Sequence, residues 1–204
     1  PTMVPAIAAM RPRSVVKPIC VRRIVPVAAA LILGISGKAD AESYIWLPTA
    51  SEVLNWDDTA NWLPDTAFPN AVGDFAVINT DITGNQTIIL NEQITLGALH
   101  LGDLNSTHVF TLSLGGAGSL RMDNDGMAAE IRQLSQNQPG NTIGVGVETV
   151  GDLNISGVGN AALIFSGPIS SAAASGTQTI SITESHVRFA GDVSDGTTGG
   201  KVAL

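Results

Sequence analysis

Three tryptophans, Trp46, Trp56 and Trp62, lie close together in a chain that has one tyrosine and five phenylalanines. Asp57 and Asn61 stand directly beside them. Flat aromatic rings combined with carboxylate and amide groups can stack on a sugar and hydrogen-bond to it. The same indoles can instead be buried together as a small core that covers the first turn of a stacked-strand structure. We favour the buried cap and keep Trp46, Trp56 and Trp62 as the alternative, a ligand-stacking site.

Nucleophilic catalysis has little support in the sequence. A hydrolytic triad needs a Ser or Cys, a His and a carboxylate that converge in space. The three histidines are His100, His108 and His186. His186 directly follows Ser185, but adjacent residues on a strand point to opposite faces of a sheet. We interpret each histidine as a solvated strand residue rather than a catalytic base.

Cleavage of a glycan would need two carboxylates that flank the scissile bond. Two sequence pairs supply carboxylates, Asp57 with Asp58 and Asp123 with Asp125. Both pairs lie in predicted turns, where acidic residues are common. We therefore predict no catalytic residue.

Two glycine-rich segments resemble parts of calcium-binding loops. Residues 115–120 begin like the nonapeptide G-G-x-G-x-D, but Leu120 stands where the carboxylate is required. Residues 123–126 resemble part of an EF-hand loop, but the alignment puts Arg121 and Arg132 at positions that need carboxylates. Both segments predict turns, and we expect no metal ion or other cofactor.

A change of composition at Ala41 divides the chain. Six of the ten Lys and Arg residues precede it, against one of the eighteen Asp and Glu residues. A basic stretch that ends at Arg23, an apolar run over 24–35 and the sequence Ala39-Asp40-Ala41 are typical of a signal peptide. The apolar run is well short of the roughly 20 residues that span a bilayer. We therefore predict an exported protein, extracellular or at the outer cell surface, with no membrane span after cleavage.

The part of the chain after Ala41 carries four basic residues against seventeen acidic ones and has no cysteine. So acidic a surface repels phosphate backbones, which disfavours a nucleic-acid partner. Without disulfides, a secreted domain must be stabilised by an apolar core or by stacked repeats.

Short runs of alternating apolar and polar residues predict strands, as over 111–114, 152–155 and 179–182. Gly, Asn and Asp separate these runs and predict turns. The one predicted helix covers residues 127–134, where Met127 and Ile131 share a face. The sequence therefore indicates an all-β fold.

A weak repeat of the form G-x-L-x-apolar underlies the predicted strands. Its key positions are Leu99, Leu120 and Leu153, and Val187 continues the alternation. Irregular spacing of such positions is typical of a β-solenoid whose turns stay in register while their connections vary in length. A β-sandwich with uneven loops would give the same spacing and is the alternative. We expect the four side chains to point inward on successive turns.

The tryptophan-rich segment also carries a family resemblance. Trp46, the run Trp56-Asp57-Asp58-Thr59-Ala60-Asn61-Trp62 and the run Pro69-Asn70-Ala71-Val72-Gly73-Asp74 resemble the opening of bacterial surface proteins that contain autotransporter-associated β-strand repeats. Residues 163–170 and 187–194 are similar to the strand-Gly-strand units of that family. The resemblance covers about 46–204 and implies a right-handed parallel β-helix at the cell surface. Residues 195–204 read as a turn entering another strand, so we expect an N-terminal fragment of such a passenger.

The predicted organisation has three parts: a signal peptide over 1–41, a Trp-rich N-terminal cap over 42–80 and β-solenoid turns over 81–204. The predicted function is that of a secreted or cell-surface structural or adhesive module without enzymatic activity. Its expected partners are extracellular glycans or cell-surface components. The alternatives are a carbohydrate-binding β-sandwich that uses the three tryptophans, and a fragment of a β-helical enzyme that degrades polysaccharides.

Overall fold

A computed structural model of the chain describes residues 40–136, 140–184 and 186–204. These residues form nineteen strands and one turn of 3-10 helix, Thr59–Asn61. The basic and apolar parts of the predicted signal peptide lie outside the described residues.

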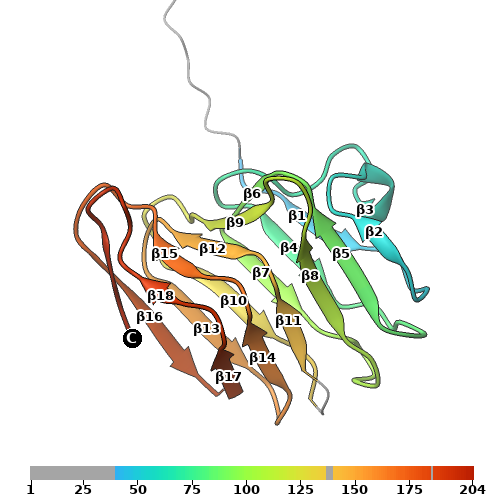
Figure 1. Cartoon of the computed structure of the whole chain (residues 1–204). Helices are drawn as coiled ribbons and strands as arrows, with labels where there is room; N and C mark the ends of the chain where they lie inside the picture. The colour runs from blue at the N-terminus through green and yellow to red at the C-terminus, as the bar shows by residue number, and fades with distance from the viewer. Residues whose placement is uncertain (1–39, 137–139, 185) are drawn as a thin grey trace, which may run out of the picture. The chain divides into compact units, whose positions relative to one another are not determined.

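The strands form three sheets, and the order within each sheet is the order in space (Figure 1). Sheet A contains β3 (Trp62–Leu63), β1 (Ser43–Trp46), β4 (Phe75–Ile78), β7 (Ala98–Leu101), β10 (Ala129–Gln133), β13 (Leu153–Gly157), β16 (Thr177–Thr183) and β19 (Lys201–Ala203). Sheet B contains β2 (Val53–Asn55), β5 (Gln86–Leu90), β8 (Phe110–Leu114), β11 (Asn141–Ile143), β14 (Ala162–Phe165) and β17 (His186–Phe189). Sheet C contains β6 (Gln93–Leu96), β9 (Ser119–Met122), β12 (Gly146–Thr149), β15 (Ile169–Ser171) and β18 (Val193–Ser194).

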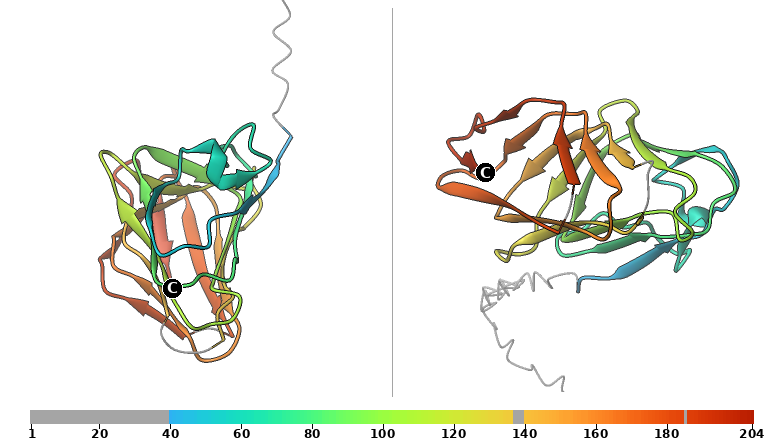
Figure 2. Two further views of the ribbon diagram at one scale, coloured as in Figure 1. Left: turned by 90° about the vertical axis from the view of Figure 1, so that its right-hand side faces the viewer. Right: turned by 90° about the horizontal axis from the view of Figure 1, so that it is seen from below.

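The order of the strands shows how the chain winds. From β4 to β18 the chain passes from sheet A to sheet B to sheet C and then returns to sheet A, one step further along. Strands that are neighbours in a sheet are parallel, with the exception of β1 and β3. The views in Figure 2 show the three sheets wrapped around a common interior. The described residues therefore form a β-solenoid of about five turns, which confirms the predicted fold class and excludes the β-sandwich with its antiparallel sheets.

The interior of the solenoid is built from ladders of aligned apolar side chains. In sheet B, Ile88 pairs with Leu112, Leu112 with Ile143, and Ile143 with Phe165. All four side chains are fully buried. Buried and half-buried residues alternate along these strands because successive side chains point to opposite faces. Each turn thus buries its apolar residues against the turns before and after it.

The predicted repeat gives the correct inward orientation of its four key side chains, but it does not identify which strands are aligned with one another. Leu99, Leu120 and Leu153 are fully buried, and Val187 is half-buried against the core, so all four point inward. However, Leu99 and Leu153 belong to sheet A, Leu120 to sheet C and Val187 to sheet B. They do not form one ladder, because each turn contains three strands with the same alternation of apolar and polar residues.

The predicted helix over 127–134 is wrong, because most of this segment is strand β10. Its residues pair in parallel with β7 on one side and β13 on the other, which satisfies the backbone hydrogen-bonding groups without a helix. Met127 is 66% exposed in the turn before the strand, while Ile131 is fully buried. Gln133 is also buried, and this polar residue at an inward position hides the strand alternation.

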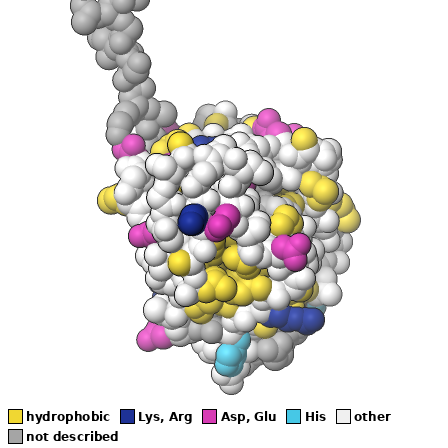
Figure 3. All heavy atoms as spheres, turned by 60° about the vertical axis from the view of Figure 1, so that its left-hand side comes forward, with side chains coloured by type: hydrophobic (Ala, Val, Ile, Leu, Met, Phe, Trp, Pro, Cys, Tyr) yellow, Lys and Arg dark blue, Asp and Glu magenta, His cyan; other side chains and the backbone are white. Residues whose placement is uncertain are grey.

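The two ends of the solenoid differ. At the N-terminal end, β3 pairs antiparallel with β1 and the tryptophans fill the interior. The predicted cap over 42–80 contains β1 and β2, which already belong to sheets A and B. Figure 3 shows hydrophobic side chains gathered on the face where the last turn lies. The last strands carry the half-buried residues Val187, Phe189, Val193 and Val202.

Candidate functional site

The three tryptophans predicted as cap or ligand site form one buried cluster. The ring centroids of Trp46 and Trp62 are 5.0 Å apart, and those of Trp56 and Trp62 are 4.8 Å apart. None of the three side chains is exposed. Nε1–H of Trp46 donates to Oε1 of Gln86 at 2.7 Å. Nε1–H of Trp56 donates to the carbonyl of Pro69 at 3.0 Å, and that of Trp62 donates to the carbonyl of Trp56 at 2.8 Å.

This geometry favours the buried cap over the sugar platform. A ring without exposed surface offers no face to a sugar, and an indole N–H that already has an internal acceptor is not left to bind a ligand. Tyr44 extends the cluster, with its ring centroid 6.5 Å from that of Trp62 in an edge-to-face arrangement. Its hydroxyl donates to Oε2 of Glu42 at 2.8 Å, and burial, followed by this contact, raises the pKa of Tyr44 to about 12.

The histidines are distributed over different parts of the solenoid. His100 lies on the outer face of sheet A, His108 in the connection between β7 and β8, and His186 at the start of β17. Nε2 of His100 is 3.7 Å from Oε2 of Glu130. The imidazole ring of His100 packs edge-to-face with the ring of Phe75, with the two ring centroids 4.5 Å apart. Burial is the main cause that lowers the pKa of His100. The structure does not bring the three histidines together.

The glycine-rich segments are tight turns, as predicted. Gly116 and Gly126 have positive φ angles of 52° and 85°, which glycine adopts without strain. Asn124 and Met127 form an isolated antiparallel bridge that closes the second turn. Among residues 40–136, 140–184 and 186–204, no group of three or more His, Cys, Asp or Glu side chains is placed to hold a metal ion.

A polar surface on the outer face of sheet C is the best candidate for a functional site. The residue pairs of sheet C align one outward position on each of its five strands, in the order Thr95, Arg121, Glu148, Ser170 and Ser194. We call this set the sheet C column. It runs across the turns, parallel to the solenoid axis, so that neighbouring members come from parts of the chain that are distant in sequence.

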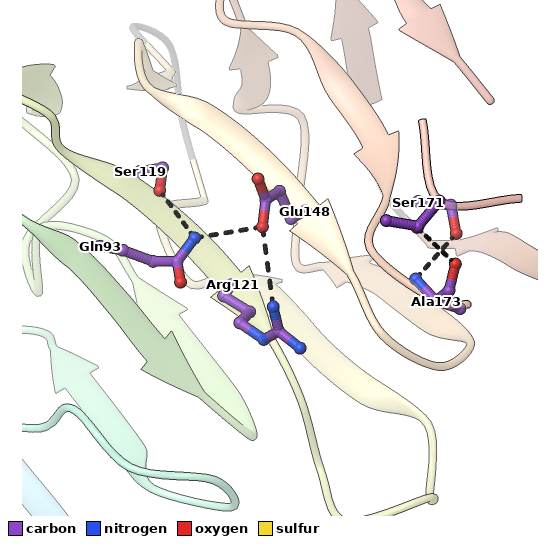
Figure 4. Close-up of polar contacts among 7 residues, drawn as sticks. Gln93, Ser119, Arg121, Glu148, Ser171 and Ala173 are labelled. Atoms are coloured by element: carbon purple, nitrogen blue, oxygen red, sulfur yellow. Dashed lines mark hydrogen bonds and ion pairs between the residues drawn. The ribbon is translucent and has the colours of Figure 1, made fainter. Parts of the chain in front are cut away.

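The contacts in the sheet C column centre on Glu148 (Figure 4). Its Oε2 accepts a hydrogen bond from Nε2 of Gln93 at 3.1 Å and lies 4.0 Å from a guanidinium nitrogen of Arg121. Nε2 of Gln93 also donates to Oγ of Ser119 at 3.4 Å. Arg121 and Glu148 are each about one third exposed, at 34% and 38%, so the pair remains accessible to a ligand.

Beside the sheet C column lies a groove of about 440 Å³. We call it the sheet C groove. Its lining comes from strands of sheet C, from the residues on either side of β15 and from the connection after β18. The lining consists of Arg121, Glu148, Pro168, Ser170, Ser171, Ala172, Ser194, Asp195, Thr197 and Thr198. A volume of this size falls within the roughly 300–1,000 Å³ that is usual for ligand pockets. The lining has two carboxylates, one guanidinium and several hydroxyl groups, and no aromatic ring.

Sequence reasoning missed this groove. Arg121 stands out in the sequence only as a misfit in an EF-hand alignment, and Ser170 ends the strand-Gly-strand unit over 163–170. No candidate site predicted from the sequence includes Glu148 or Asp195. Alternation with buried residues, such as Leu120 beside Arg121, places Arg121, Glu148 and Ser170 on the outer face. Asp195 lies in the connection after β18. Their proximity follows from the register between turns, which the sequence alone does not specify.

Among the described residues, no helix is long and apolar enough to cross a membrane. A scan against protein-family models, a search of curated proteins and a search of solved structures each gave no match to this chain.

Proposed function

We propose that this protein is an exported structural or adhesive module that contacts extracellular glycans or cell-surface components without catalysing a reaction. The observation that carries the proposal is the contrast between the interior and the outer face of sheet C. Apolar ladders stack the turns into a regular scaffold, while the sheet C column presents one polar side chain from each of the five strands of sheet C. A repeated polar surface on a preformed scaffold is suited to contact an extended ligand.

The export part of the proposal rests on the change of composition at Ala41. In a bacterial host, the full chain should be processed after Ala41, so that the mature protein begins at Glu42. Replacing Ala41 by Arg should block processing, because a small residue is required before the cleavage site. Mass spectrometry of the exported product checks this, and a product that retains residues 24–35 would contradict it.

The adhesive part of the proposal is tested with the exported product. Labelled protein should be retained on bacterial cells or on immobilised extracellular polysaccharide. Protein unfolded by heat is the control, since adhesion through the sheet C column requires the stacked turns. Equal retention of folded and unfolded protein, or no retention of either, would contradict an adhesive function.

A polysaccharide-degrading enzyme is the second candidate, and one observation favours it. Glu148 and Asp195 both line the sheet C groove, and glycoside hydrolysis uses a pair of carboxylates that flank the scissile bond. Incubation of the exported product with soluble polysaccharides should then release new reducing ends. The variant Glu148→Gln should abolish that release while leaving the melting temperature unchanged.

A further inference from the structure

We propose that the sheet C groove binds a neutral saccharide chain that lies along the sheet C column. This inference rests on the proposed adhesive function and names the site and the ligand class. The groove is lined by residues in and beside β9, β12, β15 and β18 and by the connection after β18.

The hydrogen-bonding groups of the groove suit a ligand rich in hydroxyl groups. The hydroxyls of Ser170, Ser194 and Thr197 make no hydrogen bond to any residue that the structure describes. A serine or threonine hydroxyl both donates and accepts, as does each hydroxyl of a sugar. Among the lining residues, Pro168 and Ala172 are the only apolar ones, so a largely apolar ligand would leave the polar groups unpaired.

The charges of the groove favour a neutral ligand over an acidic one. Arg121, the one basic residue of the lining, lies beside Glu148, and Asp195 adds a second carboxylate. The groove therefore carries more negative than positive charge. The chain after Ala41 has four basic residues against seventeen acidic ones, so its field repels a polyanionic glycan as well.

The connection after β18 forms one wall of the groove and is held in place before any ligand binds. Oγ1 of Thr198 donates to the carbonyl of Ala173 at 2.7 Å, and the amide of Gly200 donates to the same carbonyl at 3.1 Å. Oδ1 of Asp195 accepts from the amide of Val202 at 3.1 Å. A Cβ atom on Gly196 would lie 1.8 Å from the carbonyl oxygen of Ser171, so only glycine lets the wall approach this closely. Preorganisation of this kind reduces the ordering that binding requires.

The spacing of the column defines how the ligand lies. Neighbouring strands of a sheet are about 4.8 Å apart, so a chain parallel to the solenoid axis meets a new polar side chain at each strand. Arg121, Glu148, Ser170 and Ser194 are successive members of that series. An elongated oligosaccharide therefore contacts several turns at once, whereas a monosaccharide contacts one or two.

The experiment measures binding of the exported product to neutral oligosaccharides of glucose, mannose and N-acetylglucosamine, each a few sugar units long, by calorimetry. Oligogalacturonate of the same length is the acidic probe. We expect at least one neutral oligosaccharide to bind more tightly than its monosaccharide and more tightly than oligogalacturonate. Preferred binding of oligogalacturonate would overturn the inference.

Variants then locate the site. Ser170→Ala removes one hydroxyl from the groove and should raise the Kd about 2- to 10-fold, which corresponds to the loss of one ordinary hydrogen bond. Ser113→Ala is the matched control, because Ser113 is an equally half-buried, outward-pointing serine on sheet B. Its Kd should equal that of the unmodified chain.

The result separates the groove from the general function. Suppose that the chain is retained on cells, but Ser170→Ala and Glu148→Gln bind the oligosaccharide as tightly as the unmodified chain. The groove is then not the site, although the adhesive function stands. If no oligosaccharide binds and the chain is not retained, both the groove and the adhesive function are wrong. Equal weakening by Ser170→Ala and Ser113→Ala would also overturn the inference, since it would show a loss unrelated to the groove.

Discussion

The indole Nε1–H of Trp46 donates a hydrogen bond of 2.7 Å to Oε1 of Gln86 in the interior of the solenoid. Gln86 is 1% exposed, and its Nε2 donates in turn to the carbonyl of Ala50 at 2.7 Å. The side chain of Gln86 thus joins β1, the connection to β2 and β5. One buried amide holds the first turn to the second at the end of the structure where the tryptophans lie.

Replacement of Gln86 tests this link. Gln86→Leu should lower the free energy of unfolding by about 1–3 kcal/mol, because the Trp46 N–H would be left buried without an acceptor. Chemical denaturation measures the change. The exposed Gln93 is the control, and Gln93→Leu should change stability by no more than about 0.5 kcal/mol. A Gln86→Leu protein as stable as the unmodified one would show that Trp46 has another partner.

Removal of a cap indole should be severe. Trp62→Ala should destabilise the fold by roughly 3–5 kcal/mol, the usual range for the loss of a buried large aromatic side chain. Leu63→Ala, at the next residue and 53% exposed, should have little effect. In the unmodified protein, tryptophan fluorescence should resist a soluble quencher. Strong quenching in the folded state would contradict the burial of the cluster.

The alternation within β13 gives a paired prediction. Leu153 is fully buried and pairs with Ala129 and Ile180, whereas its neighbour Asn154 is exposed. Leu153→Asp should disrupt the turns around β13, because it places an unpaired carboxylate in an apolar interior. Asn154→Asp should change stability by no more than about 0.5 kcal/mol. A large effect of Asn154→Asp would mean that the strand faces the other way.

Hydrogen exchange reports how far this damage extends. Each turn contacts only its neighbours, so Leu153→Asp should reduce protection mainly in β10, β13 and β16 and leave β1 and β4 protected. Uniform loss of protection along the chain would instead indicate that the solenoid unfolds as one cooperative unit.

Tyr44 supplies a pH-dependent signal, because it is the only tyrosine of the chain. Burial and the contact with Glu42 raise its pKa from 10.0 to about 12 in the folded protein. The protonated form is therefore favoured by folding. This contribution to stability is fully present below about pH 10 and is lost as the pH rises towards about 12. Ultraviolet absorbance should show tyrosinate in the folded protein only near pH 12, and Glu42→Gln should lower that midpoint. A midpoint at the ordinary value of a free tyrosine would contradict the burial of the phenol group.

Alternation of apolar and polar residues was sufficient to predict an all-β fold, and the weak repeat with its irregular spacing favoured the β-solenoid over the β-sandwich. Alternation identified the strands that overlap residues 111–114, 152–155 and 179–182, and the inward orientation of Leu153. Alternation did not identify the strand within 127–134. There the buried Gln133 occupies an inward position, and Met127 and Ile131 have the spacing of one face of a helix. Local sequence does not reveal that β7 and β13 flank this segment and satisfy its backbone.

The sequence predicts neither the register between turns nor the candidate site, because both depend on how the whole chain winds. Three strands of each turn share one pattern, so Leu99 and Leu120 look equivalent although they lie in different sheets. Arg121 and Glu148 are neighbours in the sheet only because the connections between β9 and β12 have the lengths that bring the two strands into this register. Only the full winding of the chain determines these distances.

The parallel pairing of the sheets has a mechanical consequence. Hydrogen bonds between strands run from one turn to the next, so tension along the solenoid axis loads these bonds directly. We expect stretching to extend the chain in steps, one turn at a time, rather than in a single event. Among the described turns, the one with β18 should break early, because β18 spans only Val193–Ser194, and the tryptophan-filled turn should break late. A module of this kind absorbs pulling forces as a series of small extensions.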